Sequence, residues 1–204
     1  MTAGAWFIAF EGGEASGKST QARLLAADLD AVLTREPGGT TVGERIRALF
    51  LDTEVVLDPR AEALLVAADR AQHVAEVVRP ALETGRHVVT DRYIGSSLAY
   101  QGFGRGLGLD DVRQLSDWAT GGLWPDLVVL LAVPAEVASA RLGARGLDRM
   151  ESAGADFHRR VAEGFAALAA ADRDRWIVVD GSPSVDEVAA AVRAAVRDRL
   201  HLPA

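Results

Sequence analysis

Short hydrophobic runs alternate with longer stretches of helical periodicity along the whole chain. A short hydrophobic run between turn residues is typical of a buried strand, whereas hydrophobic positions three and four apart indicate an amphipathic helix. Strands are therefore expected at Ala5–Glu11, Ala31–Arg35, His87–Asp91, Leu127–Val133 and Trp176–Asp180. Helices are expected at Lys18–Asp28, Val42–Leu51, Pro59–Thr84, Leu109–Thr120, Asp156–Ala171 and Val185–Leu200, with a further helix from Ala135 and a loop at Gly102–Gly108.

This alternation of strands and helices predicts an α/β fold with a five-stranded parallel sheet covered by helices on both faces. The run Leu127–Val133 is hydrophobic throughout, as expected of a central strand. No repeat, low-complexity tract or linker divides the sequence, so we expect residues 1–204 to form one domain. Ligands of such sheets bind at the carboxyl ends of the strands.

Composition narrows the class of protein. The chain has no cysteine, which excludes disulfides, thiolate metal sites and cysteine nucleophiles. Its formal net charge of −7 argues against non-specific binding to nucleic acid. The longest hydrophobic run is too short to span a bilayer, and the first residues lack the basic region of a signal peptide. We therefore expect a cytoplasmic protein that binds neither membranes nor nucleic acid.

The strongest chemical signal is a phosphate-binding loop. The segment from Gly12 to Ser19 matches the pattern G-x-x-x-x-G-K-[ST], follows a predicted strand and opens a predicted helix. Its glycines allow backbone N–H groups to face a phosphate, Lys18 supplies a compact positive charge, and Ser19 supplies a hydroxyl for Mg²⁺. Lys18 is the only lysine in the chain, whose other basic residues are all arginine. The motif predicts a P-loop NTPase-like core.

Two further motifs follow predicted strands. Asp91-Arg92-Tyr93 ends the third strand, where an aspartate can hold Mg²⁺ and an arginine can bind a phosphate through two hydrogen bonds. The segment Thr34–Thr40 places Arg35 at the end of the second strand, just before a tight turn. The phosphate loop and these arginines predict two adjoining anion sites at one edge of the sheet.

Taken together, these motifs resemble the thymidylate kinase family. The blocks that carry the resemblance, in the order and spacing of the family, are Glu11–Ser19, Thr34–Thr40, Ala67–His73, Asp91–Tyr93, Ser96–Gly102 and Asp148–Glu151. The resemblance covers nearly the whole chain. It implies a nucleoside monophosphate kinase that transfers a phosphoryl group from ATP to dTMP, giving ADP and dTDP for dTTP biosynthesis, with Mg²⁺ as cofactor.

The resemblance also implies the roles of individual residues. Candidates for ATP binding are Gly12, Gly13, Glu14, Ala15, Ser16, Gly17, Lys18, Ser19, Thr20 and, near the adenine, Arg141. Candidates for dTMP binding are Glu14, Arg35, Pro37, Val66, Arg70, Arg92, Ser97, Tyr100 and Gln101. Within this set Arg70 would contact the thymine base, Arg35 and Arg92 the phosphate, Ser97 and Gln101 the base edge, and Tyr100 the deoxyribose. Candidates for Mg²⁺ are Ser19, Asp91 and Glu151.

One position departs from the family pattern. Val66 stands four residues before Arg70, where the family usually has a phenylalanine that stacks on thymine. Val66 keeps a hydrophobic wall, but stacking worth ~1–3 kcal/mol would be lost unless another ring takes its place. Tyr100 and Phe103 are the candidates.

An arginine-rich segment suggests a lid at about residues 143–155. Arg141, Arg145 and Arg149 recur every four residues, a spacing that would place them on one helical face, with glycines between them. The variable positions of the phosphate loop, from Gly13 to Ser16, contain no basic residue. The resemblance therefore implies the bacterial type of the family, in which lid arginines assist catalysis. With Lys18 and Arg92, we expect Arg145 and Arg149 to form the catalytic set.

Two other functions remain open on the sequence alone. A kinase of the same fold could act on another nucleoside monophosphate, which the departure at Val66 motivates. A protein of another class, a nucleotide-binding switch, would use the phosphate loop without phosphoryl transfer, but it has no need for the second anion site. The predicted helix Pro59–Thr84 is hydrophobic on more than one face, and the resemblance implies that it forms a homodimer.

Overall fold

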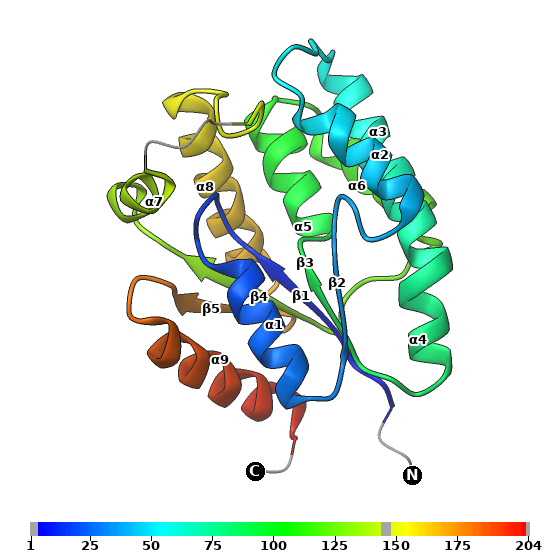
Figure 1. Ribbon diagram of the computed structural model, residues 1–204, viewed down its shortest axis with the longest axis vertical. Coiled ribbons are helices and arrows are strands. Elements are labelled where there is room, and N and C mark those ends of the chain that lie inside the picture. Colours follow the sequence, from blue (N-terminus) through cyan, green and yellow to red (C-terminus); the bar gives the residue numbers. More distant parts are fainter. Residues whose placement is uncertain (1–3, 144–147, 203–204) are drawn as a thin grey trace.

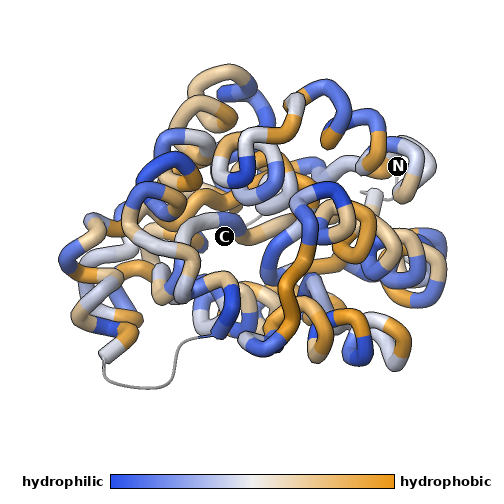
Figure 2. Tube along the Cα trace, turned by 90° about the horizontal axis from the view of Figure 1, so that it is seen from above, coloured by the Kyte–Doolittle hydropathy of each residue, from blue (hydrophilic) through white to orange (hydrophobic). Residues whose placement is uncertain are grey.

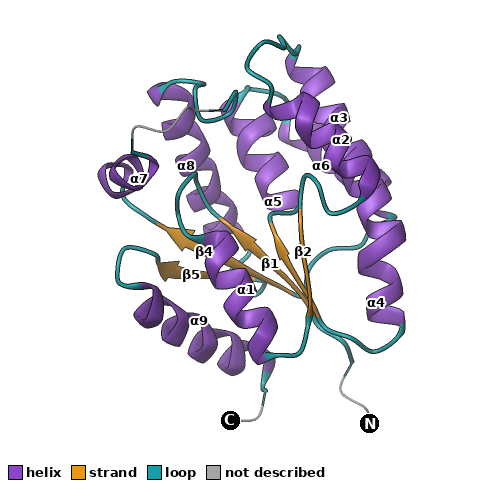
Figure 3. Cartoon of the chain, viewed as in Figure 1, coloured by secondary structure: helices purple, strands orange, loops and turns teal. Residues whose placement is uncertain are grey.

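Within the described residues, five parallel strands form one sheet in the order β2-β3-β1-β4-β5. The computed structural model describes residues 4–143 and 148–202. Figures 1 and 3 show the strands side by side in the middle of the molecule with helices around them. The predicted parallel sheet with helices on both faces is confirmed. None of the helices in the described ranges is both long and hydrophobic enough to cross a membrane.

The elements follow the predicted alternation. The strands are β1 (Phe7–Glu11), β2 (Val32–Arg35), β3 (Val88–Asp91), β4 (Leu127–Ala132) and β5 (Trp176–Asp180). The helices are α1 (Lys18–Asp28), α2 (Thr41–Leu51), α3 (Pro59–His73), α4 (Arg79–Glu83), α5 (Ile94–Ser97), α6 (Leu109–Thr120), α7 (Ala135–Leu142), α8 (Ala155–Ala171) and α9 (Val185–Leu200), with π-helical segments η1 (Val74–Val78) and η2 (Leu98–Gly104).

The hydrophobic core has two layers because side chains alternate along each strand. Ile8 and Phe10 point to the face covered by α1 and α9, where they pack with Leu25 and Val192. Phe7 and Ala9 point to the opposite face, which α3 to α6 and α8 cover. Figure 2 shows hydrophobic and hydrophilic positions alternating along the helical coils of the chain, as expected of helices with one buried side.

One predicted loop is partly helical. α5 and η2 form a continuous helical stretch that ends at Gly104, so the expectation of a loop over Gly102–Gly108 was wrong for its first three residues. Gly104 is required by packing, because a Cβ there would lie 2.6 Å from the buried ring of Phe157; a Cβ at Gly102 would lie 2.5 Å from the end of the Leu109 side chain, which would have to shift. The predicted helix Pro59–Thr84 is confirmed in extent, because α3, η1 and α4 follow one another without a break.

The predicted lid does not place its arginines on one helical face. α7 ends at Leu142, and Gly143 takes φ 62° and ψ −151°, a conformation that ends the helix. Arg141 therefore lies at the end of α7, whereas Arg149 lies in a separate turn before α8. Arg145 lies outside the described residues. The lid expectation for Arg141 and Arg149 was thus wrong in its geometry, because α7 ends at Leu142 and does not include Arg149.

Candidate active site

Residues 12–17 connect β1 to α1 in a tight loop. Gly12 has φ +145°, and a Cβ there would lie 2.6 Å from the carbonyl oxygen of Leu131, so only glycine fits. Gly17 has φ +91° and directly precedes α1, whose first turn has no side-chain cap. The N–H groups at the start of α1 are therefore available to a ligand, and the helix dipole favours an anion.

The side chain of Lys18 folds back over this loop. Its Nζ donates hydrogen bonds to the carbonyl oxygen of Gly13 at 2.6 Å and to Oγ of Ser16 at 3.1 Å. Burial, assisted by the nearby positive charge of Arg92, lowers the pKa of Lys18 to about 8. The ammonium group is thus charged at neutral pH and held where an anion on the loop would meet it.

A pocket opens in front of the phosphate loop, and we call it the loop pocket. Its lining residues are Glu14, Ala15, Ser16, Gly17, Lys18, Ser19, Thr20, Arg35, Glu36, Arg47, Asp91, Arg92, Arg141, Asp148 and Glu151. It brings together the three predicted Mg²⁺ residues, Ser19, Asp91 and Glu151. The Ser19 hydroxyl donates to Oδ2 of Asp91, whereas the buried Oδ1 of Asp91 has no hydrogen-bond partner among the described residues.

Arg92 stands at the side of the loop pocket with its hydrogen-bonding capacity largely used. Its Nη2 donates to Glu14 at 2.7 Å and to the Tyr100 hydroxyl at 3.2 Å. Its Nη1 donates to the carbonyl oxygen of Gly12 and to Oγ of Ser96, both at 3.0 Å. Its backbone has φ +71°, which is rare for a residue with a side chain. Several contacts therefore fix this guanidinium in one place.

The positive charges near Glu14 lower the pKa of its carboxyl group. Burial alone would raise the pKa of Glu14, but Arg92 and Lys18 outweigh it and lower the pKa to about 2. Glu14 is therefore a carboxylate at neutral pH. It also accepts a hydrogen bond from the Tyr100 hydroxyl at 2.7 Å.

A second pocket adjoins the first, and we call it the side pocket. Its lining residues are Glu14, Glu36, Pro37, Arg47, Phe50, Leu51, Val66, Asp69, Arg70, Arg92, Tyr93, Ser96, Ser97, Tyr100, Gln101, Asp148 and Met150. Every residue predicted to bind dTMP lies here except Arg35, which lines the loop pocket. The two pockets share Glu14, Glu36, Arg47, Arg92 and Asp148.

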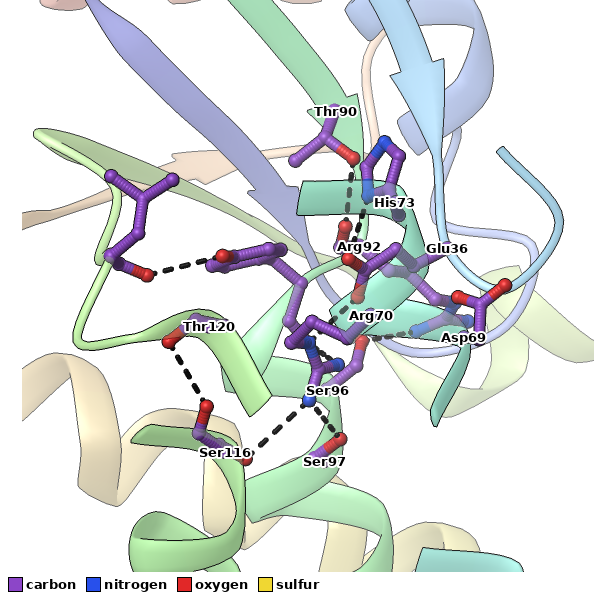
Figure 4. Close-up of polar contacts among 12 residues, drawn as sticks. Glu36, Asp69, Arg70, His73, Thr90, Arg92, Ser96, Ser97, Ser116 and Thr120 are labelled. Carbon is purple, nitrogen blue, oxygen red and sulfur yellow. Dashed lines mark hydrogen bonds and ion pairs between the residues drawn. The ribbon is translucent and has the colours of Figure 1, made fainter. Parts of the chain in front are cut away.

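A buried ionic cluster underlies the side pocket (Figure 4). Arg70 donates from Nε to Glu36 at 2.8 Å and from Nη1 to Ser97 at 3.0 Å, and His73 lies 2.7 Å from the other oxygen of Glu36. Asp69 accepts the N–H of Gly38, but its Oδ2 has no partner among the described residues. Burial and the charge of Glu36 raise the pKa of Asp69 to about 6. This cluster fixes the walls that α3 and the turn after β2 contribute.

Phe50 and Arg47 are among the pocket residues that sequence analysis did not single out. Phe50 at the end of α2 belongs to the same hydrophobic cluster as Val66 and Tyr100 and lines the side pocket. It is therefore a further candidate for the aromatic ring that Val66 does not provide. The candidate Phe103 instead packs against Gly164, outside the side-pocket lining. Arg47 lines both pockets and donates to the carbonyl oxygen of Pro37 at 3.0 Å. Among so many arginines, no local signal distinguishes it.

Arg141 and Arg149 have different surroundings. Arg141 lines the loop pocket and donates to the carbonyl oxygens of Gly181 at 2.9 Å and Ser182 at 3.2 Å. Arg149 lines neither pocket in the described structure. Its Nη1 donates to the fully buried carboxylate of Glu62 at 2.7 Å, and its Nε to the carbonyl oxygen of Phe50 at 2.7 Å.

Comparisons with known proteins identify the family. The family model described as thymidylate kinase matches residues 10–192. Curated thymidylate kinases are similar along nearly their whole length: that of Leifsonia xyli is 51% identical over 201 residues, covering 95% of each chain, and that of Deinococcus radiodurans is 49% identical over 201 residues, covering 96% of this chain and 98% of the relative.

A solved structure agrees with these matches. The crystal structure of thymidylate kinase from Ehrlichia chaffeensis superposes with a TM-score of 0.79 at 30% identity, covering 95% of this chain and 99% of that one. The match supports the P-loop NTPase-like fold and, with the sequence relatives, favours neither a kinase for another nucleotide nor a nucleotide switch. The chain belongs to the thymidylate kinase family.

Proposed function

We propose that ATP occupies the loop pocket and dTMP the side pocket, so that the phosphoryl group crosses at the wall they share. As a thymidylate kinase, the chain phosphorylates dTMP to dTDP at the expense of ATP. The observation that carries the division between pockets is Arg92, which lines both and is fixed by hydrogen bonds to Glu14 and Gly12.

The chemistry needs positioning and charge neutralisation rather than a protein nucleophile. During phosphoryl transfer, negative charge is spread over the equatorial oxygens of the transferred group. Cations positioned beside these oxygens lower the barrier. Lys18 would meet the β- and γ-phosphates of ATP. Arg92 and Arg47 line both pockets and would hold the phosphate of dTMP at the wall the pockets share, with Arg35 reaching it from the loop pocket.

The side pocket supports recognition of a thymine nucleotide. Phe50 and Val66 offer hydrophobic surface for the base, and Arg70, Ser97 and Gln101 offer polar groups for its edge. Arg70 is 2% exposed and tied to Glu36, so its direction is set before the nucleotide binds. We assign to Tyr100, whose ring lies under Arg92, the role of crowding a ribose 2′-hydroxyl.

Mg²⁺ fits the residues beside the phosphate loop. Mg²⁺ prefers oxygen ligands and is usually held by one or two protein groups together with the phosphates of the substrate. The Oδ1 of Asp91, which has no partner within residues 4–143 and 148–202, and the hydroxyl of Ser19 match this chemistry, and Glu151 lines the same pocket. Among the described residues no cluster of three or more acidic or histidine side chains would bind a metal without the nucleotide. When bound, Mg²⁺ would neutralise phosphate charge.

We further propose that the lid supplies catalytic cations, as in the lid-arginine type. The absence of a basic residue at positions 13–16 of the phosphate loop supports this assignment. Arg145, which lies outside the described residues, and Arg149 are the candidates, with Arg141 beside the adenine. Arg149 lines neither pocket and pairs with Glu62, so its proposed role requires it to leave Glu62 when the nucleotides bind. Arg149→Ala should lower kcat by at least ~tenfold with little change in the KM for ATP. An unchanged kcat would remove Arg149 from the catalytic set.

A homodimer is also proposed, on the evidence of an exposed hydrophobic face of α3 and α6. Leu64 on α3 and Trp118 on α6 are 58% and 82% exposed. A groove beside Leu64 is lined by Leu107, Val112 and Leu115, with Arg60 and Asp111 among its polar residues. Contiguous exposed hydrophobic surface is typical of a protein interface. Sedimentation as a 21.6 kDa monomer at micromolar concentration would contradict it. Location in the cytoplasm stays a prediction, which cell fractionation tests.

Product analysis with a loop variant tests the proposed reaction. With ATP, Mg²⁺ and dTMP, the chain should form dTDP and ADP in equal amounts. Lys18→Ala should form neither, while its circular dichroism spectrum stays that of the parent chain, because Lys18 meets phosphate rather than the core. Retained turnover in this variant would exclude the proposed role of the phosphate loop.

A further inference from the structure

A fully buried carboxylate lies directly behind the site and outside both pocket linings. Glu11 ends β1, one residue before the phosphate loop, and its side chain is inaccessible to solvent. Its Oε1 accepts the backbone N–H groups of Tyr93 at 3.0 Å and Ser96 at 2.9 Å, and its Oε2 accepts the Ser96 hydroxyl at 2.5 Å. Glu11 thus links the central strand to the start of α5.

The backbone of α5 is packed against this carboxylate. A Cβ at Gly95 would lie 2.8 Å from Oε1 of Glu11 and 2.8 Å from the ring of Trp176, so glycine is required there. The first turn of α5 therefore rests on Glu11. α5 and η2 carry Ser97, Tyr100 and Gln101 into the side pocket, and Glu11 sets the position of the element that bears them.

Glu11 also determines which way the Ser96 hydroxyl points. Because the hydroxyl hydrogen is donated to Glu11, the oxygen lone pairs of Ser96 are left to accept Nη1 of Arg92 at 3.0 Å. The opposite edge of the guanidinium, Nη2, then faces Glu14 and Tyr100. The backbone of Arg92, with φ +71°, is held separately by Thr90, whose hydroxyl donates to the Arg92 carbonyl oxygen (Figure 4).

We propose that Glu11 is a positioning residue for Arg92: through Ser96 it orients the guanidinium between the two pockets, and it fastens the helix that lines the side pocket. The proposal rests on the proposed function of Arg92 in holding the acceptor phosphate. Glu11 touches neither pocket, so its contribution to the reaction passes through Ser96 and Arg92.

Stability alone does not account for a carboxylate at this place. Burial raises the pKa of Glu11 to about 7, although Ser96, Arg92 and the N–H groups of Tyr93 and Ser96 oppose the rise. The charges that act on it are those of Arg92 at the end of β3 and Lys18 on α1. A raised folded-state pKa means that stability is lost as the pH rises through about 7. A neutral glutamine of the same shape avoids this loss at pH 8.

Steady-state kinetics of the full chain at pH 8, above the raised pKa of Glu11, test the proposal. Glu11→Gln presents an amide N–H to Ser96, which reverses the hydrogen bond that orients its hydroxyl. We expect kcat/KM for dTMP to fall by ~tenfold or more, with the KM for ATP within ~twofold. The melting temperature at pH 8 should equal or exceed that of the parent chain. Ser96→Ala, which removes the link itself, should give a loss of ~three- to tenfold in the same parameter.

The control is an exposed carboxylate elsewhere in the fold that also accepts the N–H and the hydroxyl of a serine. Glu187 accepts the backbone N–H of Ser184 at 3.0 Å and its hydroxyl at 2.5 Å at the start of α9, so Glu187→Gln makes the same chemical change without a link to Arg92. Its kinetics should match those of the parent chain.

Each outcome decides between the assignments. Kinetics of Glu11→Gln within ~twofold of the parent chain would overturn the proposal. A fall in melting temperature with equal rises in both KM values would also overturn it, because Glu11 would then support the fold alone. Arg92→Ala distinguishes failure of the proposed function from failure of the positioning role. If Arg92→Ala keeps the kinetics of the parent chain, the proposed function of Arg92 is wrong. If it loses activity while Glu11→Gln does not, only the positioning role fails.

Discussion

Glu62 on α3 provides a sharp test of how the walls of the site are held together. Its carboxylate is fully buried and accepts Gln101 Nε2 at 2.9 Å, Arg105 Nη2 at 2.9 Å and Arg149 Nη1 at 2.7 Å. Arg149 in turn donates to the carbonyl oxygen of Phe50 at 2.7 Å. One side chain therefore joins α3, η2, the end of α2 and the turn before α8.

Replacing the carboxylate of Glu62 by an amide should lower the free energy of unfolding substantially. Glu62→Gln leaves two guanidiniums without their counter-charge, and breaking a buried ion pair on one side costs ~3–5 kcal/mol. Because the side chains of Arg105 and Arg149 are 22% and 12% exposed, water can relieve part of this cost, and we expect the lower end of the range, ~3 kcal/mol. For a chain of this size that corresponds to a fall in melting temperature of ~6–12 °C.

The assay is thermal unfolding followed by circular dichroism at pH 7, with urea unfolding at 25 °C as a second measure. The matched control is Glu163→Gln, because Glu163 pairs with Arg159 at 2.9 Å on the surface of α8. Its melting temperature should stay at the parent value, since exposed ion pairs contribute little. If Glu62→Gln melts no lower than Glu163→Gln, the reasoning that this buried cluster fastens the site is wrong.

The pH dependence of the same variant gives an independent check. Burial by itself would raise the pKa of Glu62, but hydrogen bonds from Arg105, Gln101 and Arg149 outweigh it and lower the pKa below the ordinary 4.5. A lowered folded-state pKa contributes stability above the unfolded value, which is lost as the pH falls through the folded one. The difference in free energy of unfolding between the parent chain and Glu62→Gln should therefore be largest at neutral pH and decrease below pH 4.5.

Further predictions follow from other parts of the structure. In initial-rate assays, Phe50→Ala should raise the KM for dTMP by ~tenfold and leave the KM for ATP unchanged, since base stacking is worth ~1–3 kcal/mol. A KM for dTMP equal to that of the parent chain would show that Phe50 does not contact the base. Burial and Glu36 raise the pKa of Asp69 to about 6, so the parent chain loses stability as the pH rises from 3.8 through about 6, and Asp69→Asn does not. The free energy of unfolding of Asp69→Asn in urea should therefore rise relative to that of the parent chain over this range; a pH-independent difference would contradict this. Gly104→Ala should cost ~1–3 kcal/mol by overpacking against Phe157, whose ring leaves no room for a Cβ; wild-type urea stability would refute the packing argument.

Local signals in the sequence were enough for the fold and the phosphate loop. The strands, the glycines at 12 and 17 and the Lys18–Ser19 pair are each specified by neighbouring residues, and their order implies a parallel sheet with the loop at its edge. The side pocket could be listed in part because its residues belong to contiguous motifs that resemble those of a known family.

The remaining features depend on contacts between distant segments. Phe50 reaches Val66 only because α2 packs against α3, and a hydrophobic residue at the end of a helix gives no sign of this. Arg149 fits a lid pattern by spacing, yet it pairs with Glu62 from a helix far back in the sequence. Gly102 and Gly104 suggested a loop because glycine serves both turns and close packing, and only the neighbours Leu109 and Phe157 decide between them.

The central claim, that the two pockets join ATP to a thymine nucleotide, is tested most directly by the choice of acceptor. ADP release from ATP and Mg²⁺ should be measured by a coupled assay with dTMP, dUMP, dCMP, dGMP and AMP in turn. The account predicts the highest kcat/KM for dTMP, exceeding that for dUMP by roughly tenfold or more, as expected for one methyl group in a shaped hydrophobic pocket. An equal or higher kcat/KM for any other acceptor, or ADP release that no acceptor accelerates, would contradict it.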